Sequence, residues 1–266
     1  MKSGKQSFSV RCIGIGDGWP CAARHHAAFL YTFPGQSLLM DCGDSVCDAL
    51  KAAEVGFDDI DGIFLSHMHC DHVGGFFMLM QGFWLEQRTR DLRVFLPGRG
   101  IEPVRDMLDT SCIFRELLGF KTSFFSLRTG RTTVLSNTRV TPHRGSHLIS
   151  LRRQFQKRYP KTPFEAYSFV IEHGPWRIGH SGDIGAVEDL KPLLEKPLDL
   201  LVCEMAHVRP EDLFERLRGR KIGRIVFVHL ARALWEDRAQ LGKLAARLLG
   251  PIPFQIARSG ELIELP

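Results

Sequence analysis

The sequence of 266 residues offers little of the cysteine chemistry that stabilises small secreted proteins. It contains seven cysteines, and no two of them form a C-x-x-C pair. An odd count without such pairs argues against a disulfide framework or a cysteine-rich zinc site, and it favours a reducing compartment. The opening stretch MKSGKQSFSV also lacks the apolar core of a secretory signal. The sequence therefore predicts a cytoplasmic location.

Long hydrophobic runs and a large excess of one charge are missing as well. The longest uncharged apolar stretch, 73–85, contains Gly and Gln and is shorter than the ~20 residues that cross a bilayer. Lys and Arg number 35 against 30 Asp and Glu, so the net charge is 35 − 30 = +5. This mild excess permits an anionic substrate but falls short of a protein that coats DNA. We expect no membrane span and no stable DNA complex. The sequence leaves open whether the chain forms a homodimer.

Ordinary globular composition is what remains. Hydrophobic residues make up 44% and charged residues 24%. No repeat or low-complexity linker divides the chain, so we expect one domain over 1–266, with a basic, lid-like loop insertion around 148–166. Alternating strands and helices favour a layered α/β fold. Strands are expected at 8–16, 27–33, 38–40, 62–65, 92–96, 132–135, 138–141, 167–172, 176–178, 198–203, 225–228, 254–256 and 261–264, and helices at 46–55, 76–85, 102–118, 210–217 and 235–249.

The most informative segment is Ser66-His67-Met68-His69-Cys70-Asp71-His72, which follows a short apolar strand. Three histidines and an aspartate lie within six residues, and neutral imidazole and carboxylate are ligands of zinc and similar divalent ions. His67 and His69 are two residues apart, so an extended segment presents them on one face. Asp71 and His72 point differently. One metal could take the first pair and a second metal the other.

This segment resembles the H-x-H-x-D-H motif of the metallo-β-lactamase superfamily, and four further positions fit the same pattern. Asp41 resembles the aspartate that braces the metal loop from a strand end. His147, Asp183 and His229 resemble the later ligands, Asp183 being the one that bridges both metals. The resemblance implies a four-layer αββα sandwich with two divalent ions, zinc with manganese or iron as alternatives.

The resemblance also implies how the ligands divide between the two metals. One ion would take His67, His69, His147 and Asp183; the other would take Asp71, His72, Asp183 and His229. His143 is the rival of His147, and we prefer His147 because the family ligand stands a few residues after the strand.

Within the superfamily the chain resembles the ribonuclease Z group of phosphodiesterases. The glycine loop 13–20, Asp41-Cys42-Gly43-Asp44 and Ser181-Gly182-Asp183 carry this likeness. Two departures bear on the substrate: Cys203 stands where that group has a histidine before Glu204, and the Gly/Pro-rich arm that grips tRNA is missing between Glu172 and Ser181.

Several further side chains are candidates for work on the substrate. Glu204 and His207 are expected near the leaving group, as candidate proton donors. His25 and His26 either face the mouth of the site or belong to an exposed loop. The arginines of the basic segment could hold phosphates through paired contacts, or belong to a solvated loop; the candidates are Arg144, Arg152 and Arg153.

These features predict a metal-dependent hydrolase. Two divalent ions, two carboxylates and a bridging hydroxide would give the centre a net charge of about +1, which suits an anionic phosphodiester. The hydroxide, oriented by Asp71, would attack phosphorus in a small diester, a cyclic nucleotide or an RNA end. The alternatives are a hydrolase of carboxylic esters, lactones or thioesters, and a metal-binding accessory protein without catalytic activity.

Overall fold

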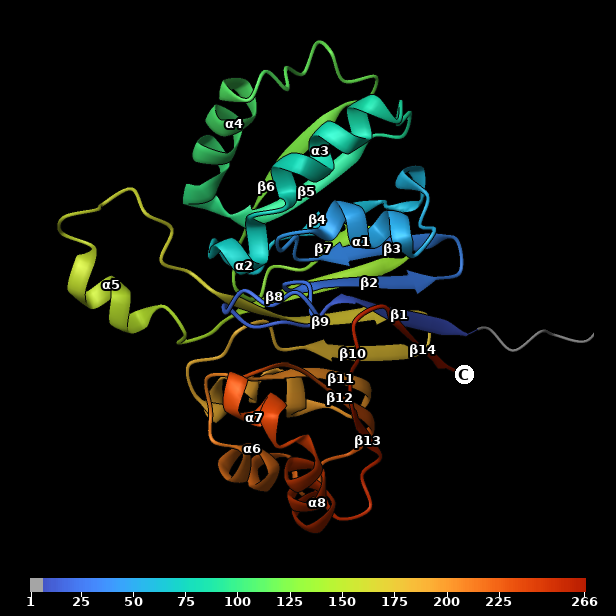
Figure 1. Cartoon of the computed structure of the whole chain (residues 1–266), viewed down its shortest axis with the longest axis vertical. Coiled ribbons are helices and arrows are strands. Elements are labelled where there is room, and N and C mark those ends of the chain that lie inside the picture. Colours follow the sequence, from blue (N-terminus) through green and yellow to red (C-terminus); the bar gives the residue numbers. More distant parts are fainter. Residues whose placement is uncertain (1–6) are drawn as a thin grey trace, which may run out of the picture. The chain divides into compact units, whose positions relative to one another are not determined.

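The computed structural model describes residues 7–266. The first six residues of the stretch MKSGKQSFSV, on which the prediction of no secretory signal rests, lie outside the described residues. The chain divides into two compact units, Met1–Ser126 with Arg258–Pro266, and Leu127–Ala257. Each unit contains one seven-stranded mixed sheet (Figure 1). The expectation of a single domain over 1–266 stays a prediction.

The first unit combines a sheet with four α-helices. Its strand order is β14-β1-β2-β3-β4-β5-β6. The strands are β1 (Phe8–Gly14), β2 (Ala28–Phe33), β3 (Gln36–Met40), β4 (Gly62–Phe64), β5 (Leu92–Pro97), β6 (Thr122–Leu127) and β14 (Glu261–Leu265). The helices are α1 (Val46–Ala52), α2 (Cys70–Val73), α3 (Phe76–Leu85) and α4 (Ile101–Thr110), with the short 3-10 turns Phe57–Asp59 and Gly98–Gly100.

Two parallel pairs in this sheet place the metal-binding motif. β3 pairs with β4, and β4 pairs with β5, in parallel. Because the carboxyl ends of parallel strands meet at one edge, Asp41 after β3 and Ser66 after β4 emerge side by side. The apolar side chains of α1 and α3, among them Val46, Leu50 and Phe83, pack into the core of this unit. The segment expected to bind metal therefore follows buried strands.

The second unit repeats the same plan. Its strand order is β13-β12-β11-β10-β9-β8-β7. The strands are β7 (Thr133–Leu135), β8 (Thr138–Arg144), β9 (Tyr167–His173), β10 (Trp176–His180), β11 (Leu198–Met205), β12 (Ile222–Leu230) and β13 (Phe254–Ile256). The helices are α5 (Ile149–Phe155), α6 (Pro210–Leu217), α7 (Arg232–Glu236) and α8 (Arg238–Leu249), with 3-10 turns at Val187–Leu190 and Leu193–Glu195.

Parallel pairing again gathers the candidate residues at one sheet edge. β10, β11 and β12 are parallel neighbours, so the segments that leave their carboxyl ends meet. Figure 1 shows α6 and α8 on one side of β11 and β12, and Phe214, Leu217 and Leu241 bury their side chains in that core. β9 and β10 form an antiparallel hairpin closed by Gly174 and Pro175 alone. The missing arm noted in the sequence is thus a two-residue turn.

Three expected elements differ most from the structure, while others, such as the helix expected at 46–55, end a few residues earlier. The helix expected over 102–118 ends at Thr110, because Cys112 has a positive φ of 57° that no helix continues. The segment expected as a loop contains α5, none of whose residues is buried. The helix expected over 235–249 begins earlier and divides at Asp237, whose Oδ1 accepts a hydrogen bond from the Gln240 amide and caps α8.

Among residues 7–266, no helix is long and apolar enough to cross a membrane. The cytoplasmic location stays a prediction.

Candidate metal centre

In the first unit, the motif is organised around the buried carboxylate of Asp41. The Ser66 amide donates to Asp41 Oδ1 at 2.6 Å, and the Ser66 hydroxyl donates to Asp41 Oδ2 at 2.9 Å. Asp41 has a positive φ of 62°, a conformation that costs of order 1–3 kcal/mol in a residue other than glycine. The strained backbone turns this carboxylate back toward the loop that follows β4. Asp41 therefore lies where the resemblance implied a bracing residue.

The same contacts fix which nitrogen of each histidine faces a ligand. His72 Nδ1 lies 2.8 Å from Asp41 Oδ2, and a carboxylate can only accept, so Nδ1 carries the proton. The Ser66 hydroxyl gives its own proton to Asp41, so it accepts from His67 Nδ1 at 3.1 Å. Both rings thus keep the Nε2 lone pair for a metal, which is the usual division of labour at histidine ligands.

The spacing of the ligand atoms fits a metal better than it fits direct hydrogen bonds. His72 Nε2 and Asp71 Oδ2 are 3.6 Å apart, and the His67 ring lies 4.1 Å from that of His72 and 4.6 Å from that of His69 between centroids. Ligands ~2.1 Å from a tetrahedral ion stand about 3.4 Å from one another. The first unit therefore offers one nitrogen–oxygen pair, His72 Nε2 and Asp71 Oδ2, at ligand spacing, and the rings of His67 and His69 lie close by.

In the second unit, Asp183 directs its two oxygens to two different histidines. Asp183 Oδ1 lies 3.4 Å from His229 Nε2, and Oδ2 lies 3.6 Å from His147 Nε2. Both separations match the ligand spacing above and exceed good hydrogen-bond lengths. Asp183 is buried, at 3% exposed, and His229 has a positive φ of 49°. The donor set suits a carboxylate that bridges two ions, one beside each histidine.

Glu204 and His207 form a second pair next to Asp183. Glu204 Oε1 accepts from the Ile184 amide at 3.0 Å and lies 3.0 Å from His207 Nδ1. Its Oε2 accepts from the backbone amides of Ala206 at 2.5 Å and His207 at 3.2 Å. The carboxylate acts as an acceptor in all four contacts. It therefore orients His207, while one atom from each of Asp183, Glu204 and His207 lies within 4.8 Å of the others.

Two residues that position ligands were given no role by the sequence. Ser66 connects Asp41 to the His67 ring, as described above. Asp189 Oδ2 accepts from the amide and hydroxyl of Ser146, both at 2.8 Å, and from the Gly185 amide at 2.9 Å. It ties the loop that carries His147 to the loop that follows Asp183. A carboxylate six residues after Asp183 is a weak signal, because only the fold brings it back to Ser146.

The remaining candidates lie outside these contacts. His143 is in β8, where burial lowers its pKa, and Glu195 and Arg177 are the charges that act on it. Arg144 donates to the Phe164 carbonyl at 3.2 Å, and Arg152 donates to Gln156 at 2.9 Å along α5. Arg153 is exposed on the same helix. Their role in binding substrate stays a prediction.

Cys203 supplies no ligand. It is fully buried, and burial together with the neighbouring Glu204 carboxylate raises the pKa of its thiol far above the usual range. The thiol stays protonated, so it replaces a histidine by a packing residue.

Comparison with known proteins identifies relatives of this architecture. A family model described as "Anti-Pycsar protein Apyc1" matches residues 8–197. Ribonuclease Z of Archaeoglobus fulgidus is 28% identical over 142 residues, which are 53% of this chain and 45% of that protein. Ribonuclease Z of Methanopyrus kandleri is 34% identical over 109 residues, 41% of this chain and 39% of that protein. The chain thus matches less than half the length of either relative.

Solved structures confirm the fold. The metallo-β-lactamase fold protein YhfI of Bacillus subtilis superposes with a TM-score of 0.79 at 20% identity, covering 98% of this chain and 100% of that one. The short form of human tRNase Z, ELAC1, superposes with a TM-score of 0.71 at 16% identity, covering 97% of this chain and 99% of that one. The predicted α/β metallo-β-lactamase fold and the likeness to the ribonuclease Z group are both confirmed.

Proposed function

Because this chain belongs to the Anti-Pycsar protein Apyc1 family and to the metallo-β-lactamase superfamily, we propose that it is a metal-dependent phosphodiesterase. The observation that carries this proposal is the geometry of Asp183, whose two oxygens face His147 and His229 at ligand spacing. A carboxylate so placed suits two divalent ions, which we take to be zinc, with manganese or iron as alternatives. The relatives named ribonuclease Z support a phosphodiester as the bond that is cleaved.

The proposed centre joins the two ligand sets. His67, His69, His147 and Asp183 would hold one ion, and Asp71, His72, Asp183 and His229 the other. When bound, two such ions supply Lewis acidity and lower the pKa of water toward ~7. Asp71 would accept a hydrogen bond from the attacking water and orient it toward phosphorus.

His207 is the proposed proton donor to the leaving oxygen. Its Nδ1–H is directed at Glu204, which keeps the ring in one orientation, so the proton given to the leaving oxygen is the Nε2–H of the doubly protonated ring. The side chain is 34% exposed and so accessible to a substrate. Glu204 is already occupied as an acceptor, so we assign it the role of positioning residue.

A leaving-group comparison tests this assignment. His207→Ala should slow cleavage of an alkyl phosphodiester, whose alkoxide needs a proton, far more than cleavage of bis-p-nitrophenyl phosphate, whose leaving group does not. Equal losses on both substrates would remove His207 from the role of acid.

The proposed substrate is a small phosphodiester, such as a cyclic nucleotide, or an accessible RNA end. Substrate contacts far from the reacting bond raise turnover of large substrates. The two-residue β9–β10 turn offers no arm for such contacts. We therefore expect efficient cleavage of a minimal diester and slow, inaccurate 3′ processing of pre-tRNA.

Metal-loaded protein should be assayed on bis-p-nitrophenyl phosphate, a lactone, a thioester and a pre-tRNA. Turnover of the diester above the lactone and thioester supports the proposal. Faster turnover of the lactone or thioester would make the protein a carboxylic ester hydrolase. No turnover of any substrate by protein with two bound ions would indicate an accessory metal-binding protein.

Metal content separates His147 from its rival. His147→Ala should lower the number of ions bound per chain, whereas the matched variant His143→Ala should keep two. Loss of metal in the second variant alone would exchange the two assignments.

A further inference from the structure

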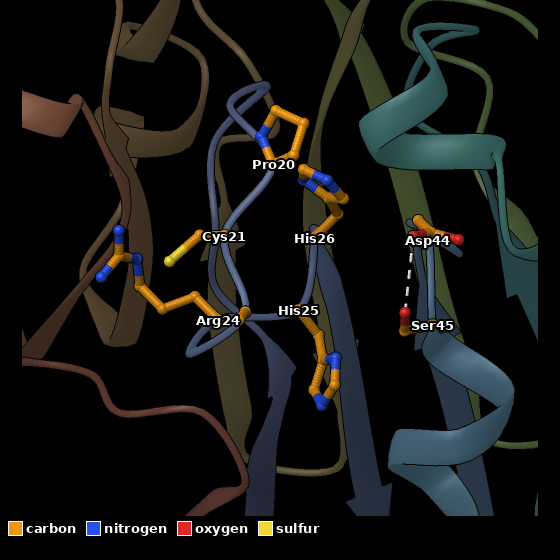
Figure 2. A pocket seen from close by; sticks show the side chains of 8 residues that line it. Pro20, Cys21, Arg24, His25, His26, Asp44 and Ser45 are labelled. Atoms are coloured by element: carbon orange, nitrogen blue, oxygen red, sulfur yellow. Dashed lines mark hydrogen bonds between the residues drawn. The ribbon is translucent and has the colours of Figure 1, made fainter.

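A small polar pocket in the first unit has no role in the chemistry described so far. Its volume is about 320 Å³, at the lower end of the range for ligand sites. Figure 2 shows its side chains, which come from the loop before β2 and from the segment before α1. The lining residues are Pro20, Cys21, Ala22, Arg24, His25, His26, Asp44 and Ser45. Imidazole, carboxylate and hydroxyl groups in this lining suit a ligand that forms hydrogen bonds.

The pocket borders the proposed metal ligands of the same unit. A Cβ atom added at Gly43 would lie 2.6 Å from His26 Cβ and 2.4 Å from the Asp71 carbonyl oxygen. A Cβ added at Gly18 would lie 3.5 Å from Asp71 Oδ2. The Gly43 backbone therefore lies between His26 and the Asp71 carbonyl and leaves no room for a side chain. The pocket thus lies one backbone layer away from the loop that carries Asp71.

His26 is held rigidly in this position. Its carbonyl side packs against Gly14, where an added Cβ would lie only 1.7 Å from the His26 oxygen, and it pairs with Gly16 in an isolated β-bridge. The Asp17 carbonyl lies 2.7 Å from His26 Nδ1 and can only accept, so Nδ1 carries the proton. In the neutral ring Nε2 is then an acceptor, and within residues 7–266 no hydrogen bond reaches it.

Of the other charged groups in the lining, the Arg24 guanidinium donates and the Asp44 carboxylate accepts. Asp44 accepts from the Ser45 hydroxyl at 3.4 Å and is otherwise an acceptor too. Figure 2 shows the His26 ring extending toward Pro20 and the His25 ring extending the opposite way, as expected for consecutive residues of an extended segment. Where His26 and Asp44 line the pocket, its side chains therefore suit a group that donates.

We propose that this pocket binds a hydrogen-bond-donating part of the substrate next to the scissile phosphodiester, and that His26 Nε2 is the acceptor that determines specificity. The donor is a hydroxyl or an N–H group, and in a nucleotide it is supplied by the 2′-hydroxyl of the sugar or by an amino group of the base. This inference rests on the proposed phosphodiesterase function. His26 acts on substrate choice and takes no part in the metal chemistry.

The test measures discrimination between substrates. The wild-type protein is compared on 3′,5′-cyclic AMP, its 2′-deoxy analogue and 3′,5′-cyclic IMP, which replaces the amino group by a keto oxygen. We expect one of the two replacements to lower kcat/KM by about 3- to 10-fold, the size of one neutral hydrogen bond. The affected analogue identifies sugar or base as the source of the donor.

Three variants then assign the effect. His26→Phe keeps a ring without the acceptor and should abolish the discrimination, and His26→Gln, which supplies a carbonyl acceptor, should restore part of it. The matched control His25→Phe should leave the ratio at its wild-type value. Discrimination that survives His26→Phe, or that His25→Phe abolishes equally, would overturn the inference.

A separate readout keeps this failure distinct from failure of the proposed function. Turnover of bis-p-nitrophenyl phosphate, which has neither donor, reports the phosphodiesterase activity alone. Calorimetric binding of the three nucleotides to metal-free protein reports the pocket alone, with the same ratio expected there. Equal affinities for all three nucleotides would also overturn the inference.

Discussion

The two units supply their shares of the proposed metal centre in different ways. In the first unit the ligands are nearly contiguous, from His67 to His72, and one carboxylate, Asp41, braces two of their rings through direct and Ser66-mediated bonds. In the second unit His147, Asp183 and His229 come from three distant segments. The ligands of the first unit depend on the local hydrogen bonds of Asp41. The ligands of the second unit depend on strand pairing and on hydrogen bonds between loops, such as those of Asp189.

The largest effect should come from Asp183, the residue of the second unit that we propose binds both ions. Asp183→Asn keeps the size of the side chain but removes its charge, so we expect loss of bound metal. Activity should fall by more than about 100-fold, because a loss of up to that size is typical of residues that only orient ligands. Metal analysis and turnover of bis-p-nitrophenyl phosphate measure both effects. The control is Asp212→Asn, at an exposed carboxylate on α6, and equal losses in the two variants would contradict the assignment.

The two positioning carboxylates sharpen the comparison. Asp41→Asn disturbs Ser66 and His72 directly, so we expect metal affinity to fall by about 10- to 100-fold. Asp189→Asn only loosens the loop that carries His147, and a smaller loss, of less than about 10-fold, should follow. Competition with a zinc chelator measures both affinities. A larger loss in Asp189→Asn would mean that the loop tie, and not the local brace, holds the centre together.

The smallest expected effect is a change in the free energy of unfolding at low pH, and it comes from His173 in β9 of the second unit. His173 is buried beside Thr138, whose hydroxyl lies 2.7 Å from His173 Nδ1, and burial lowers its pKa. Because the folded-state pKa lies below the unfolded value of ~6.5, the unfolded chain takes up the proton first. His173 thus contributes stability that is present above pH ~6.5 and lost as pH falls through the lowered pKa.

Urea unfolding of metal-free protein at pH 7 and pH 5 checks this contribution. His173→Asn keeps a polar atom for Thr138 but does not titrate, so its free energy of unfolding should change less between the two pH values than that of the wild type. The other histidines are common to both proteins and cancel. An identical change in both would exclude His173 as a source of acid sensitivity.

The difference between the two shares also explains what the sequence could predict. The spacing of His67, His69, Asp71 and His72 is visible in one short segment, and the resemblance carried the distant ligands, which no periodicity could have located. The roles of Ser66 and Asp189 depend on contacts that only the folded chain creates. The positive φ of Asp41 is a tertiary effect in the same sense, because propensity disfavours it and surrounding bonds impose it.

Sequence periodicity also gave the wrong assignment for two helical segments. The helix expected to run to Leu118 ends at Thr110, and the stretch around α5 was expected to have no helix. Apolar residues continue past Thr110 to Leu118, so the hydrophobic period shows no helix end there, and the positive φ of Cys112 sets it. The helix α5 buries none of its residues, so no hydrophobic period marks it. The helix 76–85 is apolar along almost its whole length, and the helix 210–217 buries Leu213, Phe214 and Leu217; both were predicted with their bounds correct.

The turn between β9 and β10 makes the protein a natural acceptor for grafted sequence. Gly174 faces open space, with no atom within 4 Å of where a side chain would begin. Lengthening a flexible loop costs only about 0.6 kcal/mol for each doubling, so three doublings, from two residues to sixteen, cost about 2 kcal/mol. A transplanted RNA-gripping arm could therefore be carried by this hairpin without remodelling either sheet. Cleavage of the diester would then be independent of recognition of large substrates, which a single insertion into this turn would add.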